Sequence, residues 1–155
     1  EHQKFLLATD AGYGFVAKFS DLVAKNKAGK AVLSLPKGSQ VMPPVIVPER
    51  QNLLVAAATS EGRLLVFPLA DLPELAKGKG NKIIGIPSAR AQAREELLVG
   101  LLVFGDGDVV QVQSGRQYLK LKLSDLENYR GERGRRGNRL PKGFQKVSGL
   151  AIADG

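Results

Sequence analysis

The sequence predicts an all-β fold of about three propeller-like blades, each built from four strands, in an open or partial arc. Three observations predict this fold. A unit of about 50 residues recurs along the chain, apolar runs inside each unit are separated by glycine-bearing turns, and three units are too few to close a propeller ring. We therefore expect residues 1–155 to form one domain, with blade-like units at approximately 5–50, 51–99 and 100–155.

The repeat is visible in three stretches that each end in Asp-Leu. They are LLATDAGYGFVAKFSDL at 6–22, LVAAATSEGRLLVFPLADL at 54–72 and LLVFGDGDVVQVQSGRQYLKLKLSDL at 101–126. The first two share Thr, Gly, Val, Asp and Leu at equivalent positions, and the third has a few inserted residues. Because short polar side chains favour turns, we expect Asp21, Asp71 and Asp125 to cap turns at the blade corners.

Each unit contains a predicted β-hairpin, in which two apolar runs flank a turn with the sequence DAGYG, SEGR or GDGD. The predicted strand pairs are 5–8 with 15–19, 53–58 with 64–69, and 97–104 with 109–113. Leucine and lysine alternate at 118–123, which predicts a further strand with leucines on one face and lysines on the other.

Two more strands follow the hairpin. A β-branched run comes first and ends at a proline, which cannot donate a hydrogen bond to a neighbouring strand. These runs lie at 31–35 and 82–86. A last apolar strand then leads into the next unit, at 45–47 in the first unit and at 150–152 in the third.

The charge balance indicates a polyanionic partner. The chain has 23 Lys and Arg against 15 Asp and Glu, a formal net charge of +8 and a pI near 9.9. A surface this basic suits nucleic acid first and acidic lipid headgroups second. No apolar run approaches the length of a membrane span and no signal peptide is recognisable, so we expect a soluble, unexported protein.

The residue types that build several kinds of active site are missing. The chain has no cysteine, and His2 is its single histidine, so neither a Ser-His-Asp triad nor a Cys/His metal site can form. The stretch Lys77–Gly80 lacks the spacing of a phosphate-binding P-loop. We expect no catalytic residue and no metal site. Because the chain begins with Glu1 rather than methionine, we also expect it to be part of a longer protein.

A basic, glycine-containing loop follows each Asp-Leu: KNKAGK at 25–30, KGKGNK at 77–82 and GERGRRG at 131–137. Glycine lets the backbone approach a phosphate closely, while lysine and arginine supply positive charge. Equivalent loops of an arc of blades fall on one rim, which would form a track for a duplex. The candidate DNA-binding residues are Lys25, Lys27, Lys30, Lys77, Lys79, Lys82, Arg130, Arg133, Arg135, Arg136, Arg139 and Lys142.

Several stretches resemble one known family. DAGYGFVAKFSDLVAKNKAGKA, VMPPVIV, FPLADLPELAKGKGNKIIGIPSA and GERGRRG are similar to the β-pinwheel C-terminal DNA-binding domains of the A subunits of bacterial type IIA topoisomerases. The likeness extends over nearly the whole chain. It is greater to the topoisomerase IV branch than to the gyrase branch, because the gyrase heptad Gln-Arg-Arg-Gly-Gly-Lys-Gly is absent.

The resemblance implies a non-catalytic module that holds and bends double-stranded DNA and so helps an ATP-dependent enzyme select crossings for decatenation and supercoil relaxation. It implies that the active-site tyrosine lies in the rest of the A subunit, and that Mg²⁺ and ATP are used outside this domain. ATP would be hydrolysed by the B subunit in an A2B2 heterotetramer, on the chromosome in the bacterial cytoplasm. Three alternatives remain: a gyrase-type DNA-wrapping domain, a basic propeller that binds a protein partner, and an enzyme domain of the kelch-like sort. The last shares the period of about 50 residues but would need a convergent polar site, which the sequence does not offer.

Among the candidate residues, we expect Arg133, Arg135 and Arg136 to matter most, because their density gives the largest local positive potential. Their replacement by alanine should weaken DNA binding without lowering thermal stability, since exposed loop side chains contribute little to a fold.

Overall fold

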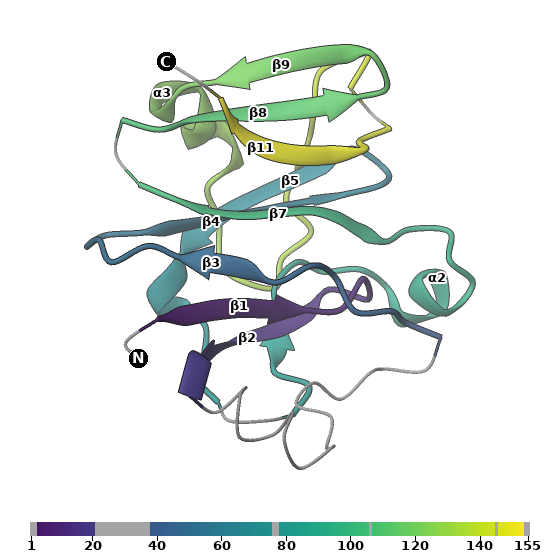
Figure 1. Ribbon diagram of the computed structural model, residues 1–155. Helices are drawn as coiled ribbons and strands as arrows, with labels where there is room; N and C mark the ends of the chain where they lie inside the picture. Colours follow the sequence, from purple (N-terminus) through teal and green to yellow (C-terminus); the bar gives the residue numbers. More distant parts are fainter. Residues whose placement is uncertain (1–2, 21–37, 76–77, 106, 145, 154–155) are drawn as a thin grey trace.

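Three antiparallel sheets are stacked one above another in the computed structural model, which describes residues 3–20, 38–75, 78–105, 107–144 and 146–153 (Figure 1). Sheet 1 contains, in spatial order, β3 (Val45–Val47), β1 (Lys4–Ala8), β2 (Tyr13–Lys18) and β6 (Asn81–Lys82). Sheet 2 contains β10 (Asn138–Arg139), β5 (Arg63–Pro68), β4 (Leu54–Thr59) and β7 (Leu98–Phe104). Sheet 3 contains β11 (Gly149–Ala153), β8 (Val109–Ser114) and β9 (Gln117–Leu121). The predicted all-β fold of three blade-like sheets is confirmed. The prediction of four strands in every blade is wrong for sheet 3, which has three strands among the described residues because no following unit of this sequence contributes a crossover strand to it.

Short helical turns connect the strands. They are η1 (Leu69–Asp71), α2 (Ser88–Gln92), α3 (Leu123–Leu126) and η2 (Glu127–Tyr129). The predicted capping role is confirmed for Asp125, whose Oδ2 accepts a hydrogen bond from the Lys122 amide (3.1 Å) at the start of α3. Asp71 lies in η1, where no side-chain cap bond is formed, and Asp21 lies outside the described residues. Within the described ranges, no helix is long and apolar enough to cross a membrane.

Two of the three predicted hairpins are confirmed, and the third is wrong. β1 pairs with β2 and β4 pairs with β5, both antiparallel. β7, however, pairs with β4, while β8 pairs with β9 and β11. The GDGD stretch therefore carries the chain from sheet 2 to sheet 3, and the third hairpin is β8–β9. The predicted alternation is present in β9, where Leu121 is buried and Lys120 is exposed.

Each of sheets 1 and 2 takes its fourth strand from the basic loop of the following unit. β6 crosses over to pair with β2, and β10 crosses over to pair with β5. We call these segments the 78–86 crossover and the 130–139 crossover. The strand predicted at 82–86 is wrong in extent: β6 ends at Lys82, because the Ile83 carbonyl and the Gly85 amide form hydrogen bonds with the 130–139 crossover instead of with β2. Ile83, Ile84 and Ile86 are buried in the core between sheets 1 and 2. The strand predicted at 31–35 lies outside the described residues.

The two largest parts of the core are apolar layers on either side of sheet 2, and a smaller cluster lies on sheet 1. Val55 and Ala57 of β4 belong to the layer shared with sheet 1, and Ala56 and Ala58 belong to the layer shared with sheet 3. Every residue of β4 is buried. This is why β4 reads as a continuous apolar run rather than an alternating one, since a sheet covered on both faces has no polar side.

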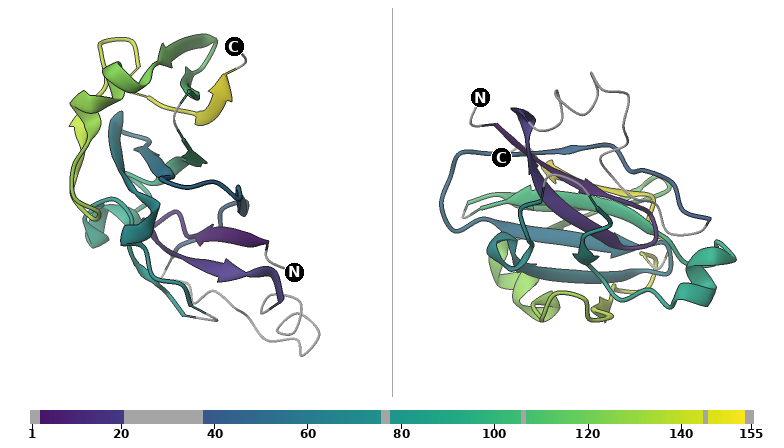
Figure 2. Two further views of the ribbon diagram at one scale, coloured as in Figure 1. Left: turned by 90° about the vertical axis from the view of Figure 1, so that its left-hand side faces the viewer. Right: turned by 90° about the horizontal axis from the view of Figure 1, so that it is seen from below.

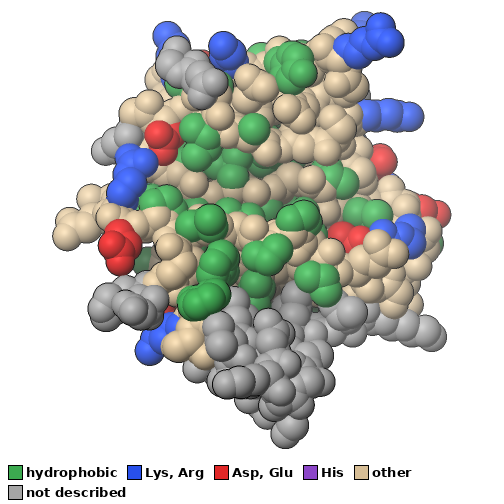
Figure 3. Space-filling model, viewed as in Figure 1, with side chains coloured by type: hydrophobic (Ala, Val, Ile, Leu, Met, Phe, Trp, Pro, Cys, Tyr) green, Lys and Arg blue, Asp and Glu red, His purple; other side chains and the backbone are tan. Residues whose placement is uncertain are grey.

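The face shown in Figure 3 carries hydrophobic side chains over β3 and β7, with Lys and Arg mostly at its margin. Val41 and Ile46 are among the exposed hydrophobic residues, at 56% and 61% exposure. The 130–139 crossover runs along a different side of the molecule, as the yellow-green trace in the left view of Figure 2 shows. The apolar face and the basic crossover are therefore separate surfaces.

An acidic residue links the GDGD turn to the loop between β3 and β4. Asp108 Oδ2 accepts hydrogen bonds from the Gly105 amide (2.9 Å) and from Arg50 Nη1 (2.9 Å). These two donors lower the pKa of Asp108, the Gly105 amide most strongly, although partial burial opposes the shift. The contact ties the connection between sheets 1 and 2 to the connection between sheets 2 and 3.

We expect this contact to weaken in acid. Because the folded pKa of Asp108 is depressed, its stabilising contribution is complete above the unfolded value of about 3.9 and is lost as the pH falls through the folded value. The difference in unfolding free energy between the wild type and Asp108→Asn should be constant above about pH 5 and should shrink below about pH 4. Urea unfolding across this range measures it, and a difference independent of pH would contradict the assignment.

Candidate nucleic-acid interface

The two crossovers enter the sheets at equivalent positions. Lys82 pairs with Tyr13 at the start of β2, and Arg139 pairs with Arg63 at the start of β5. β2 and β5 are the second strands of their hairpins. Each lies next to the edge strand that a crossover contributes, which is β6 in sheet 1 and β10 in sheet 2. Lys82 and Arg139 therefore occupy matching sites on neighbouring sheets, as a repeating rim requires.

Direct hydrogen bonds join the two crossovers. The Gly134 amide donates to the Ile83 carbonyl (3.1 Å), and the Gly85 amide donates to the Arg135 carbonyl (2.7 Å). Arg133 Nη1 donates to the Lys82 carbonyl (2.7 Å). GERGRRG is therefore held against the neighbouring basic segment by its own backbone. We use the name basic edge for five cations of the two crossovers together with Arg63 of β5: Arg63, Lys79, Lys82, Arg133, Arg135 and Arg139.

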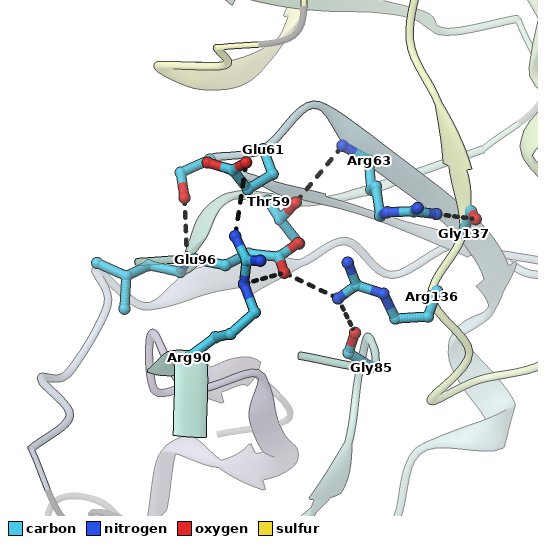
Figure 4. A network of polar contacts seen from close by, with 10 residues as sticks. Thr59, Glu61, Arg63, Gly85, Arg90, Glu96, Arg136 and Gly137 are labelled. Carbon is cyan, nitrogen blue, oxygen red and sulfur yellow. Dashed lines mark hydrogen bonds and ion pairs between the residues drawn. The ribbon is translucent and has the colours of Figure 1, made fainter. Parts of the chain in front are cut away.

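The three arginines of GERGRRG have different environments. Arg135 is an exposed cation, with 72% of its side chain accessible and Nη2 3.6 Å from the Glu132 carboxylate. Arg133 is half-buried against the 78–86 crossover. Arg136 points inward, where Nη1 donates to the Gly85 carbonyl (2.5 Å) and to Glu96 Oε1 (2.9 Å) (Figure 4). Arg136 is thus engaged by the protein itself, whereas Arg135 is presented to solvent.

The remaining predicted residues fall into three groups. Lys79 Nζ lies 4.4 Å from the centre of the Tyr13 ring, a cation–π contact that fixes the 78–86 crossover on β2. Arg130, Arg139 and Lys142 are exposed, and Arg130 also lies 3.8 Å from Glu127. The residues outside the described part of the chain are Lys25, Lys27, Lys30 and Lys77.

Sequence reasoning missed Arg63, which lies directly opposite Arg139 on paired strands. Partial burial, with the neighbouring guanidinium groups of Arg136 and Arg139, lowers the pKa of Arg63, and the Glu96 carboxylate opposes this shift. Like charges directly opposite one another destabilise a strand pair, so a bound anion would relieve the repulsion. The signal in the sequence was the position of Arg63 just after the SEG turn, but its partner is 76 residues away.

Comparisons with known proteins agree with this architecture. The family described as DNA gyrase C-terminal domain, beta-propeller, matches residues 3–48, 54–104 and 114–154. The A subunit of DNA topoisomerase 4 from Pseudomonas aeruginosa is 57% identical over 148 residues, which is 96% of this chain and 20% of that protein. The Escherichia coli protein of the same name is 47% identical over 152 residues, 98% of this chain and 20% of that protein. The chain therefore spans about a fifth of the length of these relatives.

Solved structures show the same fold. The structure of the E. coli ParC C-terminal domain superposes with a TM-score of 0.87 at 46% identity, covering 99% of this chain and 61% of that one. A DNA gyrase A C-terminal domain superposes with a TM-score of 0.74 at 18% identity, covering 99% and 50%, which shows a shared fold alone. The chain belongs to the DNA gyrase C-terminal domain family of β-pinwheel folds, in the form found at the C-terminus of the topoisomerase IV A subunit.

Proposed function

We propose that this chain binds and bends double-stranded DNA along the basic edge, as a non-catalytic domain of the topoisomerase IV A subunit. The observation that carries the proposal is the joining of two crossovers, from consecutive sheets, by the Gly134–Ile83 and Arg135–Gly85 backbone hydrogen bonds. Because both crossovers enter at equivalent strand edges, their cations would follow the arc in which the sheets are arranged in the left view of Figure 2. A duplex that follows them would bend.

The chemistry of the basic edge favours recognition of the DNA backbone rather than of its bases. The candidate contacts are cationic side chains and glycine-rich backbone, both of which suit phosphate oxygens. Neutralising phosphates releases counterions, so affinity should fall steeply with salt and depend little on sequence. We therefore assign the edge to DNA holding and shape recognition, which supports the selection of DNA crossings for decatenation and supercoil relaxation.

We also propose a wider assembly, which is supported by the match to A subunits of DNA topoisomerase 4. The domain would work attached to the rest of the A subunit, with the B subunit completing an A2B2 enzyme on the chromosome in the bacterial cytoplasm. ATP and Mg²⁺ would be used outside this domain. We favour topoisomerase IV over a gyrase-type wrapping domain because the DNA topoisomerase 4 relatives reach 57% identity and the gyrase heptad is absent.

The proposal is tested by measuring duplex affinity against salt for the wild type and for Arg135→Ala/Arg139→Ala. We expect the double variant to bind about 10-fold or more weakly and to lose about one unit of log–log salt slope for each phosphate contact removed. Two unrelated duplex sequences should give the same result. The matched control is Lys18→Ala/Lys146→Ala, which removes two exposed lysines outside both crossovers.

The control separates a localised interface from a general charge effect. Both double variants lower the net charge equally, so an equal loss of affinity would mean that DNA responds to net charge alone. Binding that is unaffected by Arg135→Ala/Arg139→Ala would exclude the basic edge as the contact. Stoichiometric binding to a protein and not to DNA would favour the protein-binding alternative.

A further inference from the structure

One carboxylate lies buried behind the basic edge. Glu96, between α2 and β7, has no accessible surface. Its Oε1 accepts a hydrogen bond from Arg136 Nη1 (2.9 Å) and lies 3.6 Å from Arg90 Nε (Figure 4). Within the described part of the chain, Oε2 is buried without a hydrogen-bond partner. Burying a carboxylate oxygen without a hydrogen bond lowers the stability of the folded state, and most buried polar atoms in proteins do have a partner. The position of Glu96 therefore needs an explanation.

Stability alone is a weak reason for keeping this ion pair, because a buried pair can often be replaced by apolar side chains without loss. DNA affinity at first sight argues against it, since a negative charge behind a DNA-binding surface repels phosphate. The geometry offers another reason. Arg136 belongs to the 130–139 crossover, whereas Glu96 belongs to the segment that leads into sheet 2, so their contact joins a surface crossover to the framework of the sheets.

The contact is placed where it can control the loop. Arg136 Nη1 also donates to the Gly85 carbonyl, and the Gly85 amide donates to the Arg135 carbonyl. Arg135 precedes the anchored residue and is exposed, and Arg139 follows it in β10. Fixing Arg136 therefore fixes the direction in which the two exposed guanidinium groups leave the surface.

We propose that Glu96 is a positioning residue for DNA: through Arg136 it holds GERGRRG so that Arg135 and Arg139 face the duplex. The inference rests on the proposed function and deepens it. Glu96 touches no DNA. Its effect is to pre-organise the loop, so that less conformational freedom is lost when the duplex binds.

Glu96→Gln gives a test in which two explanations predict opposite signs. The substitution keeps the shape of the side chain and raises the formal net charge by one unit from +8, so a purely electrostatic surface would bind DNA more tightly. Positioning predicts the reverse, a loss of about 3-fold to 10-fold at constant salt, because the anchoring bond loses its charge. The matched control is Glu132→Gln, which removes an exposed carboxylate in the same loop and should leave affinity equal or higher.

A double-mutant cycle separates positioning from simple loss of stability. If Glu96 acts through Arg136, Glu96→Gln should have almost no further effect on affinity in an Arg136→Gln background. All four proteins are compared at a temperature at which circular dichroism shows each to be folded. Additive losses of affinity, or tighter binding by Glu96→Gln as for Glu132→Gln, would overturn the proposal.

Hydrogen exchange supplies a readout that does not depend on DNA. Glu96→Gln should speed exchange of the Gly134 and Gly85 amides about 10-fold, while amides of β8 keep wild-type rates. Unchanged exchange at Gly134 and Gly85 would show that Glu96 does not hold the loop. Failure of the wild type to bind duplex would instead overturn the proposed function, and the exchange result would then still decide whether Glu96 anchors the crossover.

Discussion

Arg136→Ala is expected to lower the free energy of unfolding by about 2 to 3 kcal/mol, although Arg136 lies in a surface loop. The substitution leaves the Glu96 carboxylate buried, with Arg90 Nε at 3.6 Å as the one ion-pair partner left to it among the described residues. Removing one partner of a buried pair typically costs about 3 to 5 kcal/mol, and the partial exposure of Arg136 places this case at or below the lower end. Urea unfolding measures the change.

The matched control is Arg135→Ala, which removes the same side chain from the adjacent, exposed position. Its unfolding free energy should stay within about 0.5 kcal/mol of the wild type. DNA affinity should fall in both variants, unlike the unfolding free energy. Arg135→Ala loses a direct contact with DNA, and Arg136→Ala loses the position of the loop. Equal unfolding free energies for the two variants would mean that the Arg136–Glu96 contact does not persist in solution.

A second control removes both charges. In Glu96→Leu/Arg136→Met no carboxylate is left buried without its partner, so this protein should be more stable than Arg136→Ala. It should nevertheless bind DNA poorly, because an apolar contact lacks the directional hydrogen bond that orients the loop. A double variant that binds as tightly as the wild type would show that any anchor at this position is sufficient.

These contrasts change the expectation drawn from the sequence, in which three neighbouring arginines were to act alike. Local composition predicts a basic loop, because glycine and arginine at this density are visible in the chain. It cannot predict that Arg136 turns inward, since the partner Glu96 lies 40 residues earlier and nothing around Glu96 distinguishes it from a solvated acidic residue. Burial of a single carboxylate is decided by the packing of crossovers, which is a tertiary property.

The fold shows the same division between local and long-range information. The β1–β2 and β4–β5 hairpins were predictable because a glycine turn joins two adjacent apolar runs. β7 was misassigned because it also precedes a glycine turn, yet its partner is β4. The three-fold repeat indicates the correct pairing. Each of β3, β7 and β11 follows a basic loop and pairs with the first strand of a hairpin: β3 with β1, β7 with β4, and β11 with β8. Aligning the units by these strands would have placed β7 correctly.

The crossovers themselves depend on a glycine at the point where each one reaches its receiving sheet. Gly137 has φ +74°, and a Cβ there would lie 2.5 Å from the Leu64 carbonyl oxygen of β5. Gly80 has φ +80° at the equivalent point, and a Cβ there would collide with the backbone of Gly14 in β2. Both positions thus require a left-handed backbone and leave no room for a side chain.

We expect Gly137→Ala to destabilise the protein by about 2 to 5 kcal/mol, combining about 1 to 2 kcal/mol for the left-handed backbone with about 1 to 3 kcal/mol for the collision. The matched control is Gly107→Ala, where φ is +88° but no atom lies within 4 Å of the added Cβ, so only the backbone cost applies. Thermal and urea unfolding of both variants measure the difference. Equal destabilisation would mean that β10 does not pass this closely beside β5. We expect a larger loss of unfolding free energy for Gly137→Ala than for Gly107→Ala, together with weaker DNA binding at temperatures where the variant is folded. This result would show that the presentation of Arg139 depends on the close approach of Gly137 to β5.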